Sequence, residues 1–174
     1  MKRLLAALLC AASVLFSADA LRAQIRDIDI SVTLNDDGSA QIREVWDVTV
    51  TKGTEWYLVR ENLGDIAISD LSVTDETGLN FVNEGEWNVD RSLSQKAGRC
   101  GIVHKSSGCE ICWGVGTYDD HVFDISYKMT NVVKSANDYD FLHMQFVSDE
   151  LSSAPEHVRV TISKQDADLD SSWC

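Results

Sequence analysis

Apolar and polar residues alternate along much of the sequence, and this period of two is typical of β-strands that bury one face. The clearest alternating runs are centred on Ile30, Val48 and Ile125, and a later one on Val160. Turn-forming residues separate the runs about every 8–12 residues, and no helix-period segment is longer than a couple of turns. The sequence therefore predicts an all-β chain, with an antiparallel β-sandwich of immunoglobulin-like or jelly-roll-like form.

Several local features refine this prediction. The apolar phase slips between Ile68 and Leu71, which predicts a β-bulge. Residues 83–97 have weak periodicity, so we expect a long loop with one helical turn near its end. Residues 51–54 are expected to turn the chain into a neighbouring strand at residues 56–60. Residues 141–147 are continuously apolar enough to predict a strand buried on both faces.

Residues 1–23 have the layout of a secretory signal peptide. A basic start is followed by an apolar run over residues 4–16 and then by small residues, so cleavage fits after Ala20 or after Ala23. A run of 13 residues is too short to span roughly 30 Å of hydrocarbon as a helix. We therefore expect an exported protein, periplasmic or at the cell surface.

The chain is strongly acidic, with 15 Lys and Arg residues, 28 Asp and Glu residues and a formal net charge of −13. This balance argues against nucleic-acid binding, which needs clustered cations, and an anionic membrane surface would repel the chain. Apolar residues make up 44% of the sequence, which is enough to fill a core. At this length we expect one domain, placed at residues 24–165, followed by a truncated C-terminal tail at residues 166–174.

The cysteines that follow the signal peptide predict a disulfide, because export brings them into an oxidising compartment. Residues 99–104 and 109–113 flank a Lys-Ser-Ser-Gly turn and are expected to pair as a hairpin, which brings Cys100 close to Cys112. Cys109 and Cys112 would lie about 10 Å apart on opposite faces of one strand, too far for a bond. We therefore predict a Cys100–Cys112 disulfide and leave Cys109 and Cys174 unpaired.

No cofactor and no metal is expected. The residues with the spacing of a zinc knuckle are Cys100, His104, Cys109 and Cys112. The oxidising compartment favours the disulfide over zinc, and the acidic loops that could hold calcium are more often solvated turns. We expect a chelator to leave the melting temperature unchanged, because structural zinc would contribute roughly 10 kcal/mol or more to folding. A large fall in the melting temperature would instead support the zinc knuckle.

No motif organises a catalytic site. The sequence contains no G-x-S-x-G elbow, no H-E-x-x-H pair and no phosphate-binding loop. Each His residue is explained as a polar strand or loop residue. A hydrolase with spatially paired carboxylates stays open as an alternative, because such pairs meet in space and not in sequence. We expect no enzymatic activity.

Glu44 breaks the local pattern, because it falls on the same face as Ile42, Trp46 and Val48. If that face is the core, the carboxylate must be paired, since a lone buried charge costs several kcal/mol. Arg60, at the end of an apolar stretch, is the natural partner. We predict a partly buried Glu44–Arg60 pair between neighbouring strands of one sheet; the alternative is a Glu44 that reaches water near a sheet edge.

Aromatic residues in acid-rich loops are the candidate ligand contacts. They are Trp87, Tyr118 and Tyr139, with Asp119 and Asp120 beside Tyr118. Aromatic rings beside carboxylates suit sugar faces, which favours a carbohydrate- or peptide-binding module. An exposed cluster at one end of the sandwich would support that interpretation, and burial of all three rings would exclude it.

The sequence also resembles the N-terminal domain of a bacterial family of predicted membrane proteins, domain of unknown function 2207. The motifs that carry the resemblance are Ile28-x-Ile30-x-Val32-x-Leu34, Asp37-Gly38-Ser39, Ile42-x-Glu44-x-Trp46, Val59-Arg60, Cys112-Trp113-Gly114-Val115-Gly116, Phe123-x-Ile125-x-Tyr127 and Asn131-x-Val133. The resemblance covers roughly residues 25–162. It implies an extracytoplasmic β-sandwich ahead of membrane-spanning helices, with no known activity.

These observations together predict an exported, non-enzymatic β-sandwich domain that acts by binding or assembly at the cell envelope. Its partner is expected to be an envelope protein or a glycan. The family's members are anchored in the membrane, whereas this sequence stops at Cys174 without a membrane helix. Either the chain is a truncated product, with membrane contact only through the missing C-terminal region, or this member is freely secreted.

Overall fold

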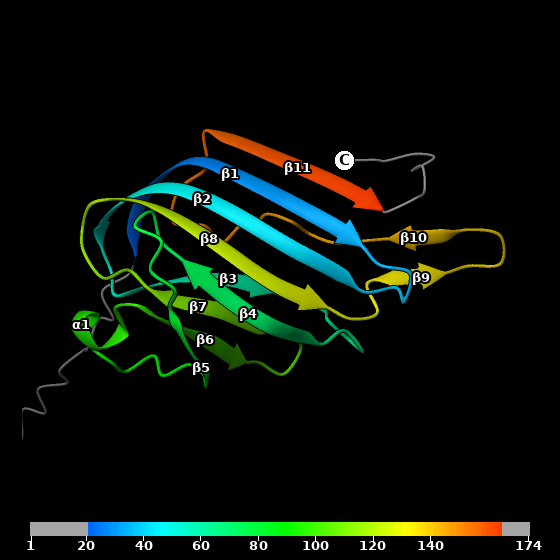
Figure 1. Cartoon of the computed structure of the whole chain (residues 1–174), viewed down its shortest axis with the longest axis horizontal. Helices are drawn as coiled ribbons and strands as arrows, with labels where there is room; N and C mark the ends of the chain where they lie inside the picture. The colour runs from blue at the N-terminus through cyan, green and yellow to red at the C-terminus, as the bar shows by residue number, and fades with distance from the viewer. Residues whose placement is uncertain (1–20, 165–174) are drawn as a thin grey trace, which may run out of the picture.

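Two β-sheets pack face to face in the computed structural model, which describes residues 21–164 (Figure 1). The first sheet has the spatial order β11 (His157–Lys164), β1 (Arg22–Leu34), β2 (Ala40–Lys52), β8 (Asp120–Met129) and β4 (Ile68–Thr74). The second sheet has the order β3 (Glu55–Arg60), β7 (Cys109–Gly114), β6 (Arg99–His104) and β5 (Val82–Glu86). The remaining elements are the β9 (Val133–Ser135) and β10 (Asp140–Leu142) hairpin and the short helix α1 (Leu93–Lys96). The sandwich expected from the sequence is therefore present.

The sheets are mixed, which differs from the wholly antiparallel arrangement that we expected. β11 pairs with β1 in parallel, and β5 pairs with β6 in parallel; the other pairings in the two sheets are antiparallel. Both parallel strands lie at a sheet edge, and each is added after the chain has crossed the sandwich. Alternation along a strand predicts which face is buried, but it carries no information on the direction of the neighbouring strand.

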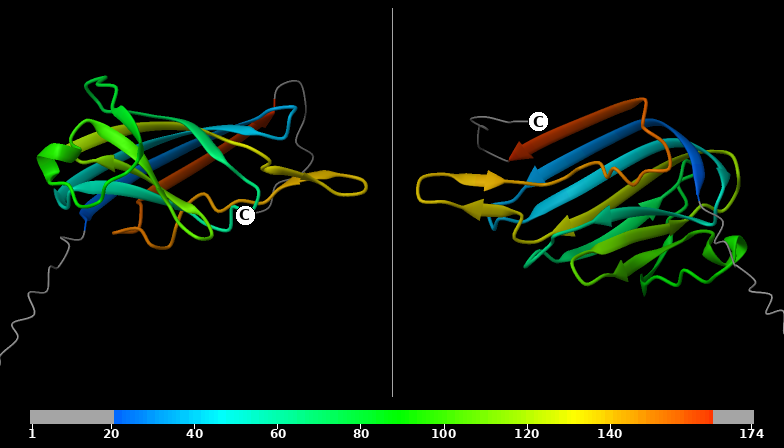
Figure 2. Two further views of the ribbon diagram at one scale, coloured as in Figure 1. Left: turned by 90° about the horizontal axis from the view of Figure 1, so that it is seen from below. Right: turned by 180° about the vertical axis from the view of Figure 1, so that it is seen from behind.

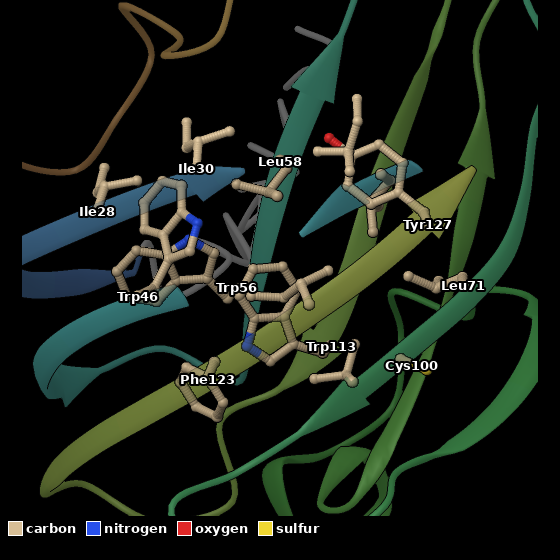
Figure 3. Packing of buried hydrophobic residues seen from close by; sticks show 14 of the residues in the cluster. Ile28, Ile30, Trp46, Trp56, Leu58, Leu71, Cys100, Trp113, Phe123 and Tyr127 are labelled. Carbon is tan, nitrogen blue, oxygen red and sulfur yellow. The ribbon is translucent and has the colours of Figure 1, made fainter. Parts of the chain in front are cut away.

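The core lies between the sheets and is built around a row of tryptophans. Trp46 of the first sheet meets Trp56 of the second edge to face at 5.6 Å between ring centroids, and Trp56 stacks on Trp113 at 6.2 Å. Phe123 completes the row against Trp113 at 5.6 Å. Figure 3 shows these rings between the aliphatic side chains of β1 and those of β4. Burial of such rings supplies much of the driving force for packing the two sheets.

Two local predictions agree with the structure and two do not, one of which is the loop predicted at residues 83–97, because β5 occupies its first residues. Pairing between β4 and β8 shifts register between Ser69 and Ser72, with Asp70 at a φ of 56°, which is the expected bulge. The expected helical turn is α1, which begins after the N-cap Ser92. The strand predicted at residues 141–147 is wrong, because only β10 forms there. The residues that follow β10 cross the open side of the sandwich as irregular chain, and every second side chain among them is half-buried.

The turn after β2 does not lead to a neighbouring strand of the same sheet. Gly53 has a φ of 109°, and the chain passes there from β2 into β3, which belongs to the opposite sheet. A Cβ on Gly53 would lie 2.8 Å from the Cα of Leu21, so both the backbone conformation and the space require glycine. The two-residue connection therefore bridges the sheets instead of closing a hairpin (Figure 2).

Strand β1 begins inside the segment assigned to the signal peptide. Arg22 pairs with Lys52 and Ala23 with Val50, and Leu21 packs against the core. Cleavage after Ala23 would remove these contacts, whereas cleavage after Ala20 would keep them. We therefore predict that N-terminal sequencing of the exported protein begins at Leu21. A mature chain that begins at Gln24 would contradict this prediction.

Within residues 21–164, no helix combines the length and the apolar character needed to cross a membrane.

Candidate functional site

Glu44, Arg60 and Tyr127 form a buried polar network between the two sheets. The Glu44 side chain is 0% exposed and forms an ion pair with Arg60, which is 5% exposed. The Tyr127 hydroxyl donates to Glu44 Oε1 at 2.6 Å and accepts from Arg60 Nη2 at 2.8 Å and from Arg60 Nε at 3.1 Å. Trp46 Nε1 donates to Glu44 Oε2 at 3.1 Å. Each polar group of the network therefore has a partner.

The structure brings Glu44 and Arg60 together, but not on neighbouring strands of one sheet. Glu44 lies on β2 of the first sheet and Arg60 on β3 of the second, so the pair joins the layers of the sandwich. The bridging connection at Gly53 is the reason for the correction. Beside Arg60, a cavity of about 10 Å³ lies between β3 and the segment at residues 146–151 and has room for one water at most.

The electrostatics of the network favour its charged form. Burial by itself lowers the pKa of Arg60, but the Glu44 carboxylate and the Tyr127 oxygen outweigh this effect, and the pKa of Arg60 is raised. The pKa of Tyr127 is raised because burial and the negative charge of Glu44 both disfavour phenolate. Tyr127 thus remains a hydroxyl, and Arg60 remains a guanidinium that pairs with Glu44. These groups bind one another, so the role of the network is structural.

The predicted Cys100–Cys112 disulfide is not formed, and the strand register explains why. Cys100 is paired with Trp113, and Cys112 is paired with Gly101. Directly paired residues share a face and successive residues alternate, so Cys100 points into the core while Cys112 points to the outer face of the second sheet. Cys109 shares a face with Cys100 but lies opposite His104. The thiols of Cys100, Cys109 and Cys112 are all free and buried.

Burial makes these thiols unreactive. It raises the pKa of Cys100 and Cys109 to about 11, and it raises the pKa of Cys112 further, with Glu55 adding to the effect. We predict that maleimide at pH 8 labels the three positions at least about 100-fold more slowly in the native protein than in denaturant, because a rise from about 9 to 11 reduces the thiolate fraction by that factor. Peptide mapping reads out each position, and fast native labelling of any of them would contradict the prediction.

The zinc knuckle is not assembled. Cys112 lies on the face of the sheet opposite to Cys100 and Cys109, and among residues 21–164 no group of three or more His, Cys, Asp or Glu side chains is placed to hold a metal ion.

The aromatic ligand candidates lie at three separate places. Trp87 is 5% exposed, and its Nε1 donates to Glu55 over the outer face of the second sheet. Tyr118 is 52% exposed in the connection from β7 to β8. Tyr139 is 64% exposed at the tip of the β9–β10 hairpin, which projects from the opposite end of the sandwich (Figure 1). The structure therefore does not bring them together as a sugar-binding platform.

The acids beside Tyr118 are used within the fold. The carbonyl of Asp119 accepts from Val50 N at 2.9 Å. The side chain of Asp120 accepts from Thr49 Oγ1 and, at 3.0 Å, from Arg26. Both contacts favour the carboxylate and lower the pKa of Asp120. This end of the molecule is thus an acidic surface braced by Arg26.

Sequence reasoning missed Lys96, the last residue of α1. Its side chain is 1% exposed, and Nζ donates to Val89 O at 2.7 Å and to Thr54 Oγ1 at 3.0 Å, with Glu55 Oε2 also at 3.0 Å. The carbonyl of Lys96 lies so close to Gly114 that a Cβ there would overlap it. The ammonium therefore fastens the segment that carries Trp87 and α1 to the outer face of the second sheet.

An open cleft of about 680 Å³ lies between the β3–β4 connection and the β6–β7 turn. Leu63 N donates to Ser107 O at 3.1 Å and joins the two segments at its base. The floor consists of half-buried aliphatic side chains packed on the core, namely Leu63, Ile66, Ile68 and Ile102. The polar residues that line it are Asn62, His104, Lys105, Ser106 and Ser107. An aliphatic floor with a polar rim is the usual arrangement of a binding cleft.

The chemistry of the cleft differs from the rest of this acidic chain. None of the described residues that line it is Asp or Glu, so facing carboxylates of the glycosidase kind are not present there. His104, Ser106 and Ser107 all line the cleft, but no side-chain hydrogen bond joins His104 to either serine in the described part of the chain. The cleft also contains no aromatic side chain on which a sugar ring could stack. The described lining of the cleft is therefore aliphatic and polar.

Comparison with known families identifies the chain. The family model described as "Predicted membrane protein (DUF2207) N-terminal domain" matches residues 24–173. The chain belongs to this family. The match confirms the resemblance seen in the sequence. Its range of residues includes nearly all of the sandwich. Comparison with curated proteins gives no sequence match.

Solved structures resemble parts of this DUF2207 domain only distantly. Native leukotriene A4 hydrolase from Saccharomyces cerevisiae aligns with a TM-score of 0.41 and 9% identity over 62% of this chain and 15% of that one. An M1 zinc metallopeptidase from Deinococcus radiodurans aligns with a TM-score of 0.33 and 11% identity, over 66% of this chain and 22% of that one. A putative protease from Parabacteroides distasonis aligns with a TM-score of 0.33 and 14% identity, over 63% of this chain and 23% of that one. The domain thus spans less than a quarter of the length of each of these proteins.

Proposed function

We propose that this DUF2207 domain is an exported, non-enzymatic module that binds a segment of another polypeptide at the cell envelope. The observation that carries the proposal is the open cleft with its aliphatic floor and its lining free of carboxylates. Glu44, Arg60 and Lys96 are each bound by neighbours within the fold. Their engagement supports the non-enzymatic part of the proposal. Membership of a family of predicted membrane proteins supports a place at the envelope.

The lining of the cleft indicates the chemistry of the bound segment. Leu63, Ile66 and Ile102 offer an apolar surface for an aliphatic side chain, while the serines and backbone groups of the β6–β7 turn offer hydrogen bonds to an extended chain. Lys105 is the cationic residue of the rim; it pairs with Glu110 at 3.2 Å, and its half-exposed ammonium would also complement a carboxylate of the bound segment. We therefore infer a polypeptide segment with an aliphatic anchor next to an acidic residue. A glycan fits less well, because the cleft contains no aromatic ring.

Site-specific photo-cross-linking in cells tests this function. A photoreactive amino acid at position 107, on the rim, is expected to cross-link the exported full-length chain to an envelope protein. The cross-linked peptide should contain an aliphatic residue beside Asp or Glu. The matched control is the same amino acid at position 94, an exposed site on α1 outside the cleft, from which no cross-link is expected.

A second variant makes the test specific for the cleft. Ala67→Trp fills the cleft from an exposed position and should abolish the cross-link from position 107 without unfolding the domain. A cross-link that persists in this variant, equal cross-linking from position 94, or a cross-linked glycan would contradict the proposal.

A further inference from the structure

The four edges of the two sheets differ in how far they are protected from pairing with another strand. β4 is interrupted by the bulge at Asp70, and β5 is interrupted between Asn83 and Glu86 and carries acidic side chains. Residues 57–60 of β3 line a small cavity together with Phe146, Ser148, Glu150 and Leu151, so that segment lies beside β3. Bulges, charges and covering segments are the devices that keep an edge strand from pairing with a neighbour.

The register of β11 is not interrupted by a bulge, although the strand carries the charges of Arg159 and Lys164. It keeps an unbroken register with β1 over eight residues, from the pair Asp27–His157 to the pair Leu34–Lys164. Figure 2 shows β11 at the outer limit of its sheet. Val158 and Val160 are 44% and 39% exposed, although their partners Ile28 and Ile30 on β1 are buried. An uninterrupted edge strand with exposed valines is a template for a further strand.

The backbone groups that face outward can be assigned from the pairing with β1. Asn35 N donates to Ser39 O at 2.9 Å, so after the bulge in β1 the backbone groups of its odd-numbered residues point toward β2 and those of its even-numbered residues point toward β11. In the parallel register with β1, the odd-numbered residues of β11 therefore bond to β1, and the N–H and C=O groups of the even-numbered residues Val158, Val160 and Ile162 lie on the free edge. The even-numbered residues also carry the apolar side chains.

We propose that this free edge pairs with the same strand of a second copy of the chain, antiparallel and centred on Val160. The self-pairing is chemically complementary. Val160 then lies opposite Val160 of the second copy, Val158 opposite Ile162, and Arg159 opposite Thr161. Glu156 lies opposite Lys164, so each end of the paired strands gains an opposite-charge contact. The result is a continuous sheet of ten strands, with five from each copy.

Other registers of the same pairing are worse. Centring on Arg159 would oppose two guanidinium groups, and centring on Thr161 would oppose Val158 with Lys164. In the register centred on Val160, the outward N–H and C=O groups of this residue bond to those of Val160 in the second copy. The contact uses a single strand from each copy and is at the small end of specific interfaces, so the dimer is expected to depend on protein concentration.

Sedimentation velocity of the exported full-length chain, over a wide range of concentration, tests the dimer. The wild-type chain should shift from monomer to dimer as concentration rises, and Val160→Lys should remain monomeric because it opposes two ammonium groups. The matched control is Val122→Lys on β8, which is 38% exposed in the interior of the same sheet and should leave the dimer intact. Thermal unfolding shows that both variants are folded. A monomeric wild type, or a dimer that survives Val160→Lys, would overturn the proposal.

Cross-linking tests the register separately. Val160→Cys should form a disulfide with its own copy under oxidation, whereas Val122→Cys should not. A dimer in which Val160→Cys fails to cross-link would overturn the pairing centred on this residue. The cleft is built from other elements, so Val160→Lys should leave the cross-link from position 107 unchanged, and failure of one proposal is distinguishable from failure of the other.

Discussion

Glu44→Ala is expected to lower the free energy of unfolding by about 3–5 kcal/mol. The substitution leaves the guanidinium of Arg60 buried without its counter-charge, and the Tyr127 hydroxyl and Trp46 Nε1 lose their acceptor. Removing one partner of a buried pair is costly because the remaining charge can reach neither water nor another carboxylate. Chemical denaturation with tryptophan fluorescence measures the loss.

The double variant separates a buried pair from two independent side chains. Replacing Glu44 and Arg60 together by leucine and methionine should cost much less than the sum of the two single changes, because neither charge is then stranded. Asp124→Ala is the control, since it breaks the exposed Arg43–Asp124 pair and should cost less than about 1 kcal/mol. Small, additive effects at Glu44 and Arg60 would show that the network is hydrated in solution and that the sheets are less closely packed there.

Lys96→Met should cost about 2–4 kcal/mol, since the variant keeps the length of the side chain but removes its ammonium. The carbonyl of Val89 and the hydroxyl of Thr54 lose this donor in a position that water does not reach freely, and the carboxylate of Glu55 keeps Trp87 Nε1 as a donor. The expected loss is smaller than at Glu44 because the Glu55 side chain is 21% exposed and regains some solvation. Thermal unfolding provides the first measurement.

The matched control for Lys96 is Lys134→Met, which removes the ammonium from an exposed pair with Asp65 and should cost less than about 1 kcal/mol. Hydrogen exchange adds a local readout. In Lys96→Met the amides of residues 87–98 should exchange faster, while those of β2 and β8 keep their protection. Equal effects of the two variants would mean that the ammonium is not what fastens α1 to the sheet.

The strands and their buried faces were predictable because each depends on nearest neighbours along the chain. Ile42, Glu44, Trp46 and Val48 all lie on the buried face of β2, as the alternation indicates. The carboxylate of Glu44 was found by its misfit to that face, a signal that needs no knowledge of the partner strand. The bulge near Asp70 was visible for the same reason, as a break in phase.

The features that sequence reasoning missed depend on contacts between distant segments. The disulfide prediction failed by a single position of register, because placing Cys112 opposite Gly101 instead of Cys100 moves its thiol to the other face. The residues around Lys96 in the sequence indicate a polar side chain in a loop. The side chain of Lys96 is buried only because this segment packs on Gly114. The cleft likewise arises where two connections meet, and no spacing within either of them predicts it.

The parallel pairing of β1 with β11 sets how late the domain can complete its fold during synthesis. The paired residues Asp29 and Arg159 are 130 positions apart, so the edge of the first sheet closes only after almost the whole domain has been made. Until then β1 has one side unpaired, and long-range pairing of this kind has a high contact order and is slow. During this interval the negative charge of the chain opposes aggregation through the unpaired strand. Within residues 21–164, the last strand completes the sheet that the first strand begins.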